Sequence, residues 1–245
     1  MDIKYAVVSS NSNREYLDFW PYVARAWKKI GIEPVIFYID SKYDREVEKH
    51  GKSYYFDSLM DWSIIQQAQS IRLWASKVLD GNFIISDMDM LPITEDYYKR
   101  GTSAIGESGI TSYSSDIIKY RWYRTNPQYP MCYLAGDPKS FNEILELDRF
   151  SDHKEFLRHL KSLNMRFGTD QKFFYNQSQK NRHIKINHLE RGWIEEKYAT
   201  RRLDKTIWPK TDYNVDEYID CHLPRPLFTN SDLCYDLFKK LNIDL

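Results

Sequence analysis

The sequence of 245 residues lacks several features that would place it in a specialised class. Its three cysteines form no framework spacing, which excludes a disulfide scaffold and favours free thiols in a reducing compartment. Glycine and proline number only nine each, which argues against disorder and low complexity. Basic and acidic residues balance at 35 each, so no net charge draws the chain toward nucleic acid or an anionic membrane.

Long hydrophobic runs are also missing. No apolar run approaches the roughly 18 residues of a membrane-spanning helix, and the first residues do not have the pattern of a signal peptide. We therefore expect a soluble, cytoplasmic protein. The length suits one domain with a substantial core, and since no repeat or linker interrupts the chain we predict a single domain over residues 1–245. Tyrosine, by contrast, is abundant at 19 residues, and its ring suits both cores and sugar-binding surfaces.

The most informative stretch covers residues 82–90. An apolar run, Phe83–Ile85, is typical of a strand buried on both faces, and Asp87 and Asp89 follow it. Side chains alternate along a strand, so both carboxylates are expected to point the same way. Mg²⁺ and Mn²⁺ prefer carboxylate oxygen and are often shared with substrate phosphate. The stretch predicts a metal–phosphate site at the carboxyl end of a central strand; the alternative is a solvated turn.

The first part of the chain alternates strand and helix patterns. Strands are predicted over 3–9, 34–39 and 52–56 and before the two aspartates. Helices are predicted over 14–30, with a kink or a restart at Pro21, and over 63–79. This order predicts an α/β fold with a mainly parallel sheet. Ligands bind at the carboxyl ends of such strands. Polar residues occupy three of these ends: Ser9–Asn13, Asp40 and Asp87–Asp89.

After Pro92 the periodicity weakens. Strands are predicted over 103–106, 131–134 and 184–187, and helices over 139–147, 154–163 and 231–241. Thr169 is expected to cap a helix that begins at Asp170. The aromatic-rich segment 107–129 is typical of a functional loop or lid, and residues 188–220 read as irregular.

Several polar elements form an ordered series along the chain. They are Ser9-Ser10-Asn11, Asp40, Arg72-Leu73-Trp74, Asp87-Met88-Asp89, Gly136-Asp137, Asp170-Gln171 and His222. With this series the chain resembles the GT-A glycosyltransferases, and its size is similar to that of small enzymes of this group encoded by chlorella viruses. The resemblance implies a Rossmann-like α/β domain with a mixed, mainly parallel sheet flanked by helices. It also implies a nucleotide-binding half, residues 1–92, and an acceptor- and sugar-binding half, residues 93–245.

The resemblance implies a divalent cation, Mn²⁺ or Mg²⁺. Asp89 would bind it, Asp87 would contact the ribose or a metal-bound water, and His222 would be a further ligand. One related family carries His-x-x-Gly-x-x-Lys-Pro-Trp, whereas here His222 is followed by Leu-Pro-Arg-Pro, without that glycine and tryptophan. His188 is the competing histidine, and either residue has the alternative of a structural role.

The resemblance also implies a site for a nucleotide-sugar donor with UDP, GDP or dTDP. Asp40 would accept a hydrogen bond from the base, with the alternative of a turn residue. Arg72 would contact a phosphate or the sugar, with the alternative of a surface salt bridge. The remaining residues assigned to the donor are Ser9, Ser10 and Asn13 at the nucleoside and Arg225 near the phosphates.

Two aspartates are candidates for the chemical step. Asp170 would contact the donor sugar or act as the base that an inverting enzyme needs, with the alternative that it only begins a helix. Asp137 is the next candidate because Gly136 permits close approach of a ligand. Aromatic side chains that would stack on an acceptor sugar, or pack in a core or lid, are Tyr113, Trp122, Tyr123 and Tyr129.

The expected activity is therefore metal-dependent transfer of a hexose or pentose from a nucleotide sugar to a glycan or other hydroxyl acceptor. The first alternative is a phosphatase or phosphotransferase of the haloacid dehalogenase type, whose Asp-x-Asp motif supplies a nucleophile. That motif usually lies on the first strand and continues with Thr or Val, whereas Met90 and Leu91 follow here. The second alternative is a nucleotide- or sugar-binding module without catalysis. A nuclease is disfavoured by the balanced charge and the lack of a basic stripe.

Overall fold

The structure is a computed structural model that describes residues 2–103, 109–113, 125–189, 202–205 and 213–244. Its strands are β1 (Tyr5–Ser10), β2 (Glu33–Asp40), β3 (Lys52–Asp57), β4 (Phe83–Ser86), β5 (Met90–Pro92), β6 (Ile110–Tyr113), β7 (Tyr133–Gly136), β8 (Ile186–Leu189), β9 (Arg202–Asp204) and β10 (Asp220–His222). Its α-helices are α1 (Arg14–Leu17), α2 (Trp20–Lys29), α3 (Ile64–Ile71), α4 (Glu95–Ser103), α6 (Pro138–Leu145), α7 (His153–Ser162), α8 (Thr169–Lys180) and α9 (Ser231–Lys240).

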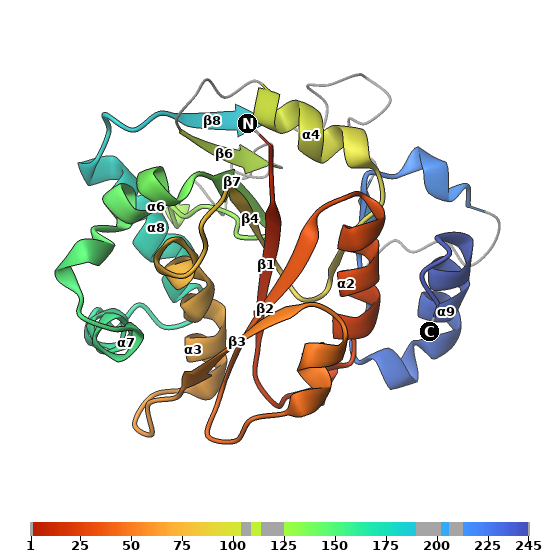
Figure 1. Cartoon of the computed structure of the whole chain (residues 1–245), viewed down its shortest axis with the longest axis horizontal. Coiled ribbons are helices and arrows are strands. Elements are labelled where there is room, and N and C mark those ends of the chain that lie inside the picture. The colour runs from red at the N-terminus through yellow and green to blue at the C-terminus, as the bar shows by residue number, and fades with distance from the viewer. Residues whose placement is uncertain (1, 104–108, 114–124, 190–201, 206–212, 245) are drawn as a thin grey trace.

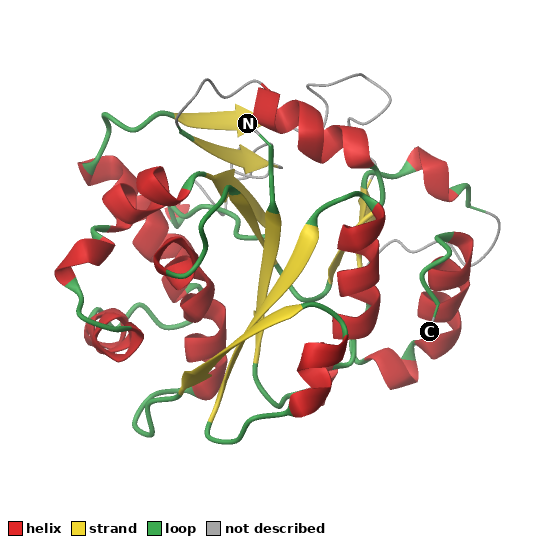
Figure 2. Ribbon diagram, in the orientation of Figure 1, coloured by secondary structure: helices red, strands yellow, loops and turns green. Residues whose placement is uncertain are grey.

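A seven-stranded sheet in the order β3-β2-β1-β4-β7-β6-β8 lies at the centre of the molecule, with helices on both faces (Figures 1 and 2). Strands β3, β2, β1 and β4 are parallel, β7 is antiparallel to β4 and β6, and β6 is parallel to β8. The expected single α/β domain with a mixed, mainly parallel sheet is confirmed. Strand order reverses at β1, which places a crevice between the carboxyl ends of β1 and β4.

Each face of the sheet has its own hydrophobic core. Along β1, Ala6 and Val8 pack in the core beneath α2 and α9, whereas Tyr5 and Val7 pack in the core beneath α3, α6, α7 and α8. The same alternation divides β4, where Ile84 faces the first core and Phe83 and Ile85 face the second. Burial on both faces explains why these strands are continuous apolar runs in the sequence.

A second, three-stranded sheet in the order β5-β10-β9 extends from the end of β4. Strand β10 is antiparallel to β5 and parallel to β9, so His222 lies opposite both Met90 and Asp204. A buried ion pair ties β9 to β10, because Arg202 Nη2 lies 2.7 Å from Asp220 Oδ2. These strands have three residues each, which is too short for a periodicity, and the sequence did not predict this sheet.

Several predicted elements need correction. The helix expected over 14–30 restarts near Pro21, which is one of the two outcomes predicted there: α1 is followed by α2, with Pro21 in the first turn of α2, where a missing N–H costs nothing. The helix expected over 63–79 tightens at Arg72 into a 3-10 helix, η2 (Arg72–Lys77). Gly168, at φ 74°, is the N-cap of α8, so Thr169 is its first residue and not its cap. Of the strand expected over 103–106, residue 103 ends α4, and residues 104–106 lie outside the described residues.

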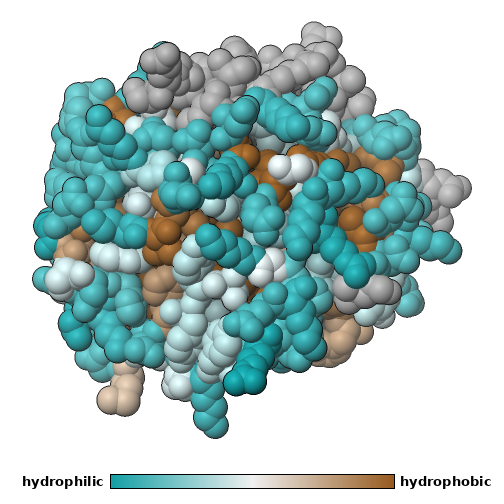
Figure 3. Space-filling model, viewed as in Figure 1, coloured by the Kyte–Doolittle hydropathy of each residue, from teal (hydrophilic) through white to brown (hydrophobic). Residues whose placement is uncertain are grey.

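The visible face in Figure 3 is largely hydrophilic, with apolar residues in small areas between polar ones. No helix in the described residues is both long enough and apolar enough to span a membrane. All three cysteines are buried as free thiols.

Candidate functional site

A pocket of about 220 Å³ opens at the carboxyl ends of β1 and β4. Most of the site residues predicted from the sequence line it: Ser9, Ser10, Asn13, Arg72, Asp87, Asp89, His222 and Arg225. The structure therefore brings together residues from both ends of the chain, as the ordered series predicted. Asp40, Asp137 and Asp170 are not among the lining residues.

The two aspartates reach the pocket from a turn and not from a strand. Strand β4 ends at Ser86, and the N–H of Met90 donates to the carbonyl of Asp87 at 3.1 Å. The alternation of a strand therefore does not explain why both carboxylates face one pocket. They also bind different partners: Asp87 pairs with Arg72, whereas Asp89 lies beside His222 and Arg225.

Arg72 joins Asp87 to Asp170 beneath the pocket. Its Nη2 lies 2.7 Å from Asp170 Oδ2, its Nη1 pairs with Asp87, and the same Nη1 donates to the carbonyl of Ser86 at 3.1 Å. The exposed fractions of the Arg72 and Asp170 side chains are 5% and 1%. Burial acts to lower the pKa of Arg72, but the two carboxylates outweigh burial and raise that pKa, which holds the guanidinium charged. The alternative of a surface salt bridge is therefore wrong for Arg72.

The side chain of Asp170 has no direct access to the pocket. Burial raises the pKa of its carboxyl group, and Arg72 opposes that rise. Its carboxylate accepts hydrogen bonds from Arg72, and the neighbouring residue Gln171 lines the pocket. This geometry supports a role for Asp170 in positioning Arg72.

Pairing of β10 with β5 places His222 beside Asp89. The N–H of Leu223 donates to the carbonyl of Asp89 at 2.8 Å, which fixes the two segments in register. His222 Nε2 then lies 3.3 Å from Asp89 Oδ2, and His222 Nδ1 lies 3.3 Å from Asp204 Oδ2. Burial acts to lower the pKa of His222, but the Asp89 carboxylate outweighs it and raises the pKa.

Asp89 and His222 fit a divalent cation. Ligand bonds of about 2.1 Å at right angles place two neighbouring ligand atoms about 3 Å apart, close to the 3.3 Å between Asp89 Oδ2 and His222 Nε2. The contact of His222 Nδ1 with Asp204 is the type of outer contact that orients a metal-binding imidazole. In the part of the chain that the structure describes, no preformed group of three His, Cys, Asp or Glu residues is present. Further ligands would come from the donor or from water.

Two cationic side chains that line the pocket lie close to Asp89. Arg225 Nε lies 3.0 Å from Asp89 Oδ2, and Lys205 Nζ lies 4.0 Å from the same atom. The guanidinium carbon of Arg225 also lies 4.5 Å from the centre of the Tyr16 ring, where a cation–π contact holds it. The pocket therefore contains both carboxylates, which suit a metal, and cations, which suit a phosphate.

The turn after β1 forms another part of the pocket wall. Asn13 caps α1 by accepting the N–H of Glu15 at 3.0 Å, and Asn11 accepts the N–H of Asn13 at 3.1 Å. Asp40 lies behind this turn and accepts the backbone N–H of Ser12 at 3.0 Å. The structure thus places Asp40 as a turn-stabilising residue, in line with the alternative weighed for it.

Two other candidates lie away from the pocket. Strand β7 is antiparallel to β4, and Gly136 pairs with Phe83, so Asp137 follows at the opposite edge of the sheet from Asp87. Asp137 caps α6 there, accepting the N–H of Ser140 at 2.8 Å. The sequence could not show that one strand would reverse. His188 lies on β8, where its ring stacks on Tyr129, and it does not line the pocket.

Of the four aromatic residues expected to stack on an acceptor sugar, two are buried in the cores and two lie outside the described residues. Tyr113 and Tyr129 are buried, with exposed fractions of 0% and 7%, and belong to the cores. Trp122 and Tyr123 lie outside the described residues. Pocket residues to which sequence reasoning assigned no role are Tyr16, Gln171, Lys205 and Phe167. Two of them had a signal: Gln171 stands beside Asp170 in the ordered series, and Tyr16 falls one helical turn after Asn13.

Comparison with known proteins finds no matching family model and no match among curated proteins. Among solved structures, the galactosyltransferase LgtC in complex with donor and acceptor sugar analogs is similar over 95% of this chain and 95% of that chain, at a TM-score of 0.52 and 12% identity. An active-site mutant of LgtC is similar over the same shares at a TM-score of 0.53 and 10% identity. A glycosyltransferase involved in glycosylation of the major capsid of PBCV-1 is similar over 96% of this chain and 100% of that chain, at a TM-score of 0.48 and 11% identity.

Identities this low establish the fold and not the chemistry. The similarity to LgtC extends over 95% of each chain, so it covers nearly the whole architecture described above. This chain has the GT-A fold of the glycosyltransferases.

Proposed function

We propose that this protein is a glycosyltransferase that uses a nucleoside diphosphate sugar and a divalent cation. The observation that carries the proposal is the arrangement around Asp89. At the switch point of a GT-A fold, its carboxylate lies 3.3 Å from His222, 3.0 Å from Arg225 and 4.0 Å from Lys205. The carboxylate–imidazole pair suits a metal ion, and the two cations suit a diphosphate. Side by side, they suit a metal ion and a diphosphate bound together.

Arg225 and Lys205 would bind the diphosphate. An arginine can contact two phosphate oxygens at once, and a lysine contributes a compact point charge. The Tyr16 ring beneath Arg225 limits where the guanidinium can move. Ser9, Ser10 and Asn13, on the wall formed by the turn after β1, would bind the nucleoside.

Asp89 and His222 would hold Mn²⁺ or Mg²⁺. When bound, the cation supplies positive charge at the diphosphate that leaves in the reaction. Asp87 lies on the same turn, and Arg72 holds its carboxylate in place. We assign Asp87 to the ribose or to a water in the metal shell.

The reaction joins the acceptor and the sugar directly. The oxygen of the acceptor hydroxyl bonds to the anomeric carbon, while the bond from that carbon to the diphosphate oxygen breaks. The leaving nucleoside diphosphate keeps the electron pair of that bond, and the hydroxyl proton passes to a base. Arg72, fixed between Asp87 and Asp170, would orient the donor for this step.

Both predicted halves of the chain would contribute residues that bind the donor. Residues 1–92 supply the nucleoside wall and the two aspartates of the turn, whereas Lys205, His222 and Arg225 come from residues 93–245. A division into a pure nucleotide half and a pure acceptor half is therefore too simple. The half that follows residue 92 also contributes to the diphosphate site.

Turnover of a donor panel tests the proposal. The protein is incubated with UDP-, GDP- and dTDP-sugars plus Mn²⁺, and release of nucleoside diphosphate is measured. Slow release from one donor without an acceptor, abolished by EDTA and restored by Mn²⁺, is expected. Release of phosphate from simple phosphomonoesters without turnover of any nucleotide sugar would favour a phosphatase. Nucleotide binding without any turnover would favour a binding module.

A further inference from the structure

Phe167 is an exposed aromatic side chain at the edge of the donor pocket. Its exposed fraction is 73%, although most large apolar side chains in the described residues are buried. It lines the donor pocket and also a neighbouring cavity of about 480 Å³. Ile65, at 52% exposure, and Gln69 are shared by the same two cavities. Phe167 thus lies at the boundary between the donor pocket and this second cavity.

The loop that carries Phe167 has an unusual backbone. Asn164, Arg166 and Gly168 have φ angles of 48°, 58° and 74°, all in the left-handed region. That region costs about 1–2 kcal/mol for an ordinary L-residue such as Arg166. Backbone strain of this kind persists where the surrounding structure enforces it, and it gathers at binding sites.

Side chains from two helices hold this loop in place. From α3, Gln66 Nε2 donates to the carbonyl of Arg166 at 2.8 Å. From α8, Thr169 Oγ1 donates to the same carbonyl at 2.6 Å, and Lys172 Nζ donates to the carbonyl of Met165 at 3.2 Å. The exposed ring therefore projects from a backbone that is fixed at several points. A loop whose backbone is already held in place loses little conformational entropy when a ligand binds to it.

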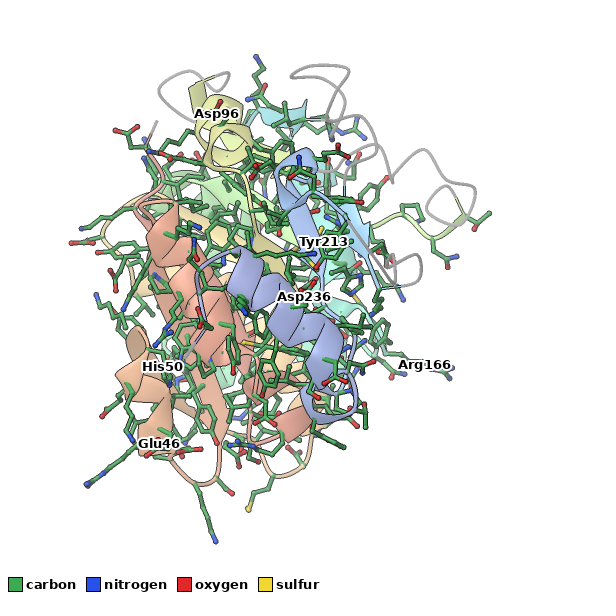
Figure 4. The ribbon with its side chains drawn as sticks, turned by 90° about the vertical axis from the view of Figure 1, so that its right-hand side faces the viewer. Glu46, His50, Asp96, Arg166, Tyr213 and Asp236 are labelled. Atoms are coloured by element: carbon green, nitrogen blue, oxygen red, sulfur yellow. The ribbon has the colours of Figure 1, made fainter. Side chains whose placement is uncertain are left out.

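The lining of the second cavity suits uncharged hydroxyl groups. The side-chain amides of Gln66, Gln69 and Asn164 both donate and accept hydrogen bonds, and the described lining contains no Asp or Glu. Lys161 at its edge is paired with Asp61. Arg166 also lines the cavity, and its side chain extends outward at the surface (Figure 4). An aromatic face with convergent amides is typical of a site for a neutral sugar.

We propose that this second cavity is the acceptor subsite and that it binds a neutral oligosaccharide whose terminal pyranose ring stacks on Phe167. The inference rests on the proposed function, because it gives the cavity a role beside the donor. The shared wall of Ile65, Gln69 and Phe167 places the acceptor hydroxyl next to the donor pocket. Phe167 then determines which acceptor binds, and its place in the wall shared with the donor pocket brings that acceptor close to the donor.

Two measurements on the full chain test the inference. An array of neutral and sialylated oligosaccharides, followed by saturation-transfer NMR on the glycans that bind, measures acceptor binding directly. Wild type is expected to bind neutral glycans, and Phe167→Ala to weaken that binding about tenfold, the equivalent of about 1.4 kcal/mol. Phe167→Tyr, which keeps the ring, is expected to retain binding.

The matched control is Phe228→Ala. Phe228 is exposed to a similar extent, 69%, and lies in the 3-10 helix η7 (Leu227–Thr229). It is expected to leave glycan binding unchanged. The KM for a neutral acceptor is expected to rise about tenfold in Phe167→Ala and to keep its wild-type value in Phe228→Ala.

The outcomes separate this inference from the proposed function. Glycan binding that depends on Phe167, without turnover of any nucleotide sugar, would support the subsite and contradict the transferase. Turnover of a nucleotide sugar with glycan binding that is equal in wild type and Phe167→Ala would contradict the subsite alone. Absence of glycan binding in wild type, preference for sialylated glycans, or transfer only to a peptide hydroxyl would also contradict the subsite.

Discussion

Arg72 Nη2 lies 2.7 Å from Asp170 Oδ2, in an ion pair that joins η2 to the first turn of α8 across 98 residues of sequence. Both side chains are almost fully buried, and Asp87 at the mouth of the pocket binds the same guanidinium. The pair connects the core beneath α3 and α8 to the pocket at the carboxyl ends of β1 and β4. A change to this ion pair is therefore expected to alter both the stability of the fold and the position of Asp87.

Removal of one partner of this pair is expected to be costly. Arg72→Met leaves the buried Asp170 without its counter-ion and is expected to lower the free energy of unfolding by about 3–5 kcal/mol. Urea unfolding measures this change. The exposed pair of Lys77 with Asp148 is the control, and Lys77→Met is expected to change stability by less than about 1 kcal/mol.

The double variant Arg72→Met/Asp170→Leu separates stability from function. Apolar side chains of similar volume are expected to recover most of the lost stability, because no buried charge is left unpaired. Turnover of the nucleotide sugar is expected to stay low, since Asp87 loses Arg72. A double variant with wild-type turnover would show that the pair serves the fold alone.

Metal binding is expected to depend on Asp89. Asp89→Ala removes the carboxylate beside His222 and is expected to abolish Mn²⁺ binding in a titration that monitors the electron paramagnetic resonance of free Mn²⁺. Asp80→Ala is the control, because Asp80 is an exposed carboxylate paired with Lys4 away from the pocket. Equal Mn²⁺ affinity in wild type and Asp89→Ala would refute the metal assignment.

Arg225 is expected to recognise the diphosphate and not the nucleoside. Arg225→Ala is expected to weaken binding of a nucleoside diphosphate about 10- to 100-fold, the range for loss of a charged hydrogen bond. Binding of the corresponding nucleoside is expected to be unchanged. Isothermal titration with both ligands measures the difference, with Arg182→Ala as the control, because Arg182 is exposed and follows the C-terminal end of α8. An equal loss of affinity for both ligands would assign Arg225 to the nucleoside.

Asp40 is expected to make the turn after β1 sensitive to acid. Burial acts to raise the pKa of Asp40, but hydrogen bonds from Ser12 and Ser41 outweigh it and lower that pKa below its ordinary value. The stabilisation is therefore present above the unfolded value of about 3.9 and is lost as the pH falls through the lower folded value. The loss of stability in Asp40→Asn is expected to be larger at pH 7 than at pH 3. A loss of equal size at both values would contradict this role.

The sequence predicted the fold because its signals were local. The apolar run Phe83–Ile85 and the helix pattern that begins at Ile64 each depend on residues close together in the chain. The pocket at the carboxyl ends of β1 and β4 follows from the sequence for a related reason. In parallel strands the polar ends meet at one edge, so Ser10 and Asp87 are expected to lie close together.

What the sequence could not predict depended on pairing between distant segments. The reversal of β7 sends Asp137 to the far edge, and no local pattern encodes that direction. The three-residue strands β9 and β10, which place Asp204 and Lys205 beside His222, are too short for a periodicity. Phe167 was missed because an exposed aromatic residue in a loop has the same local pattern as a buried one.

The most direct test of the donor site compares turnover of the active nucleotide sugar in wild type, Asp89→Ala and Asp80→Ala under one set of conditions. Release of nucleoside diphosphate in the presence of Mn²⁺ is the measured quantity. The donor site proposed here predicts Mn²⁺-dependent release by wild type and Asp80→Ala and a loss of at least about 100-fold in Asp89→Ala, the equivalent of about 2.7 kcal/mol of transition-state stabilisation. Release at the wild-type rate by Asp89→Ala would contradict it.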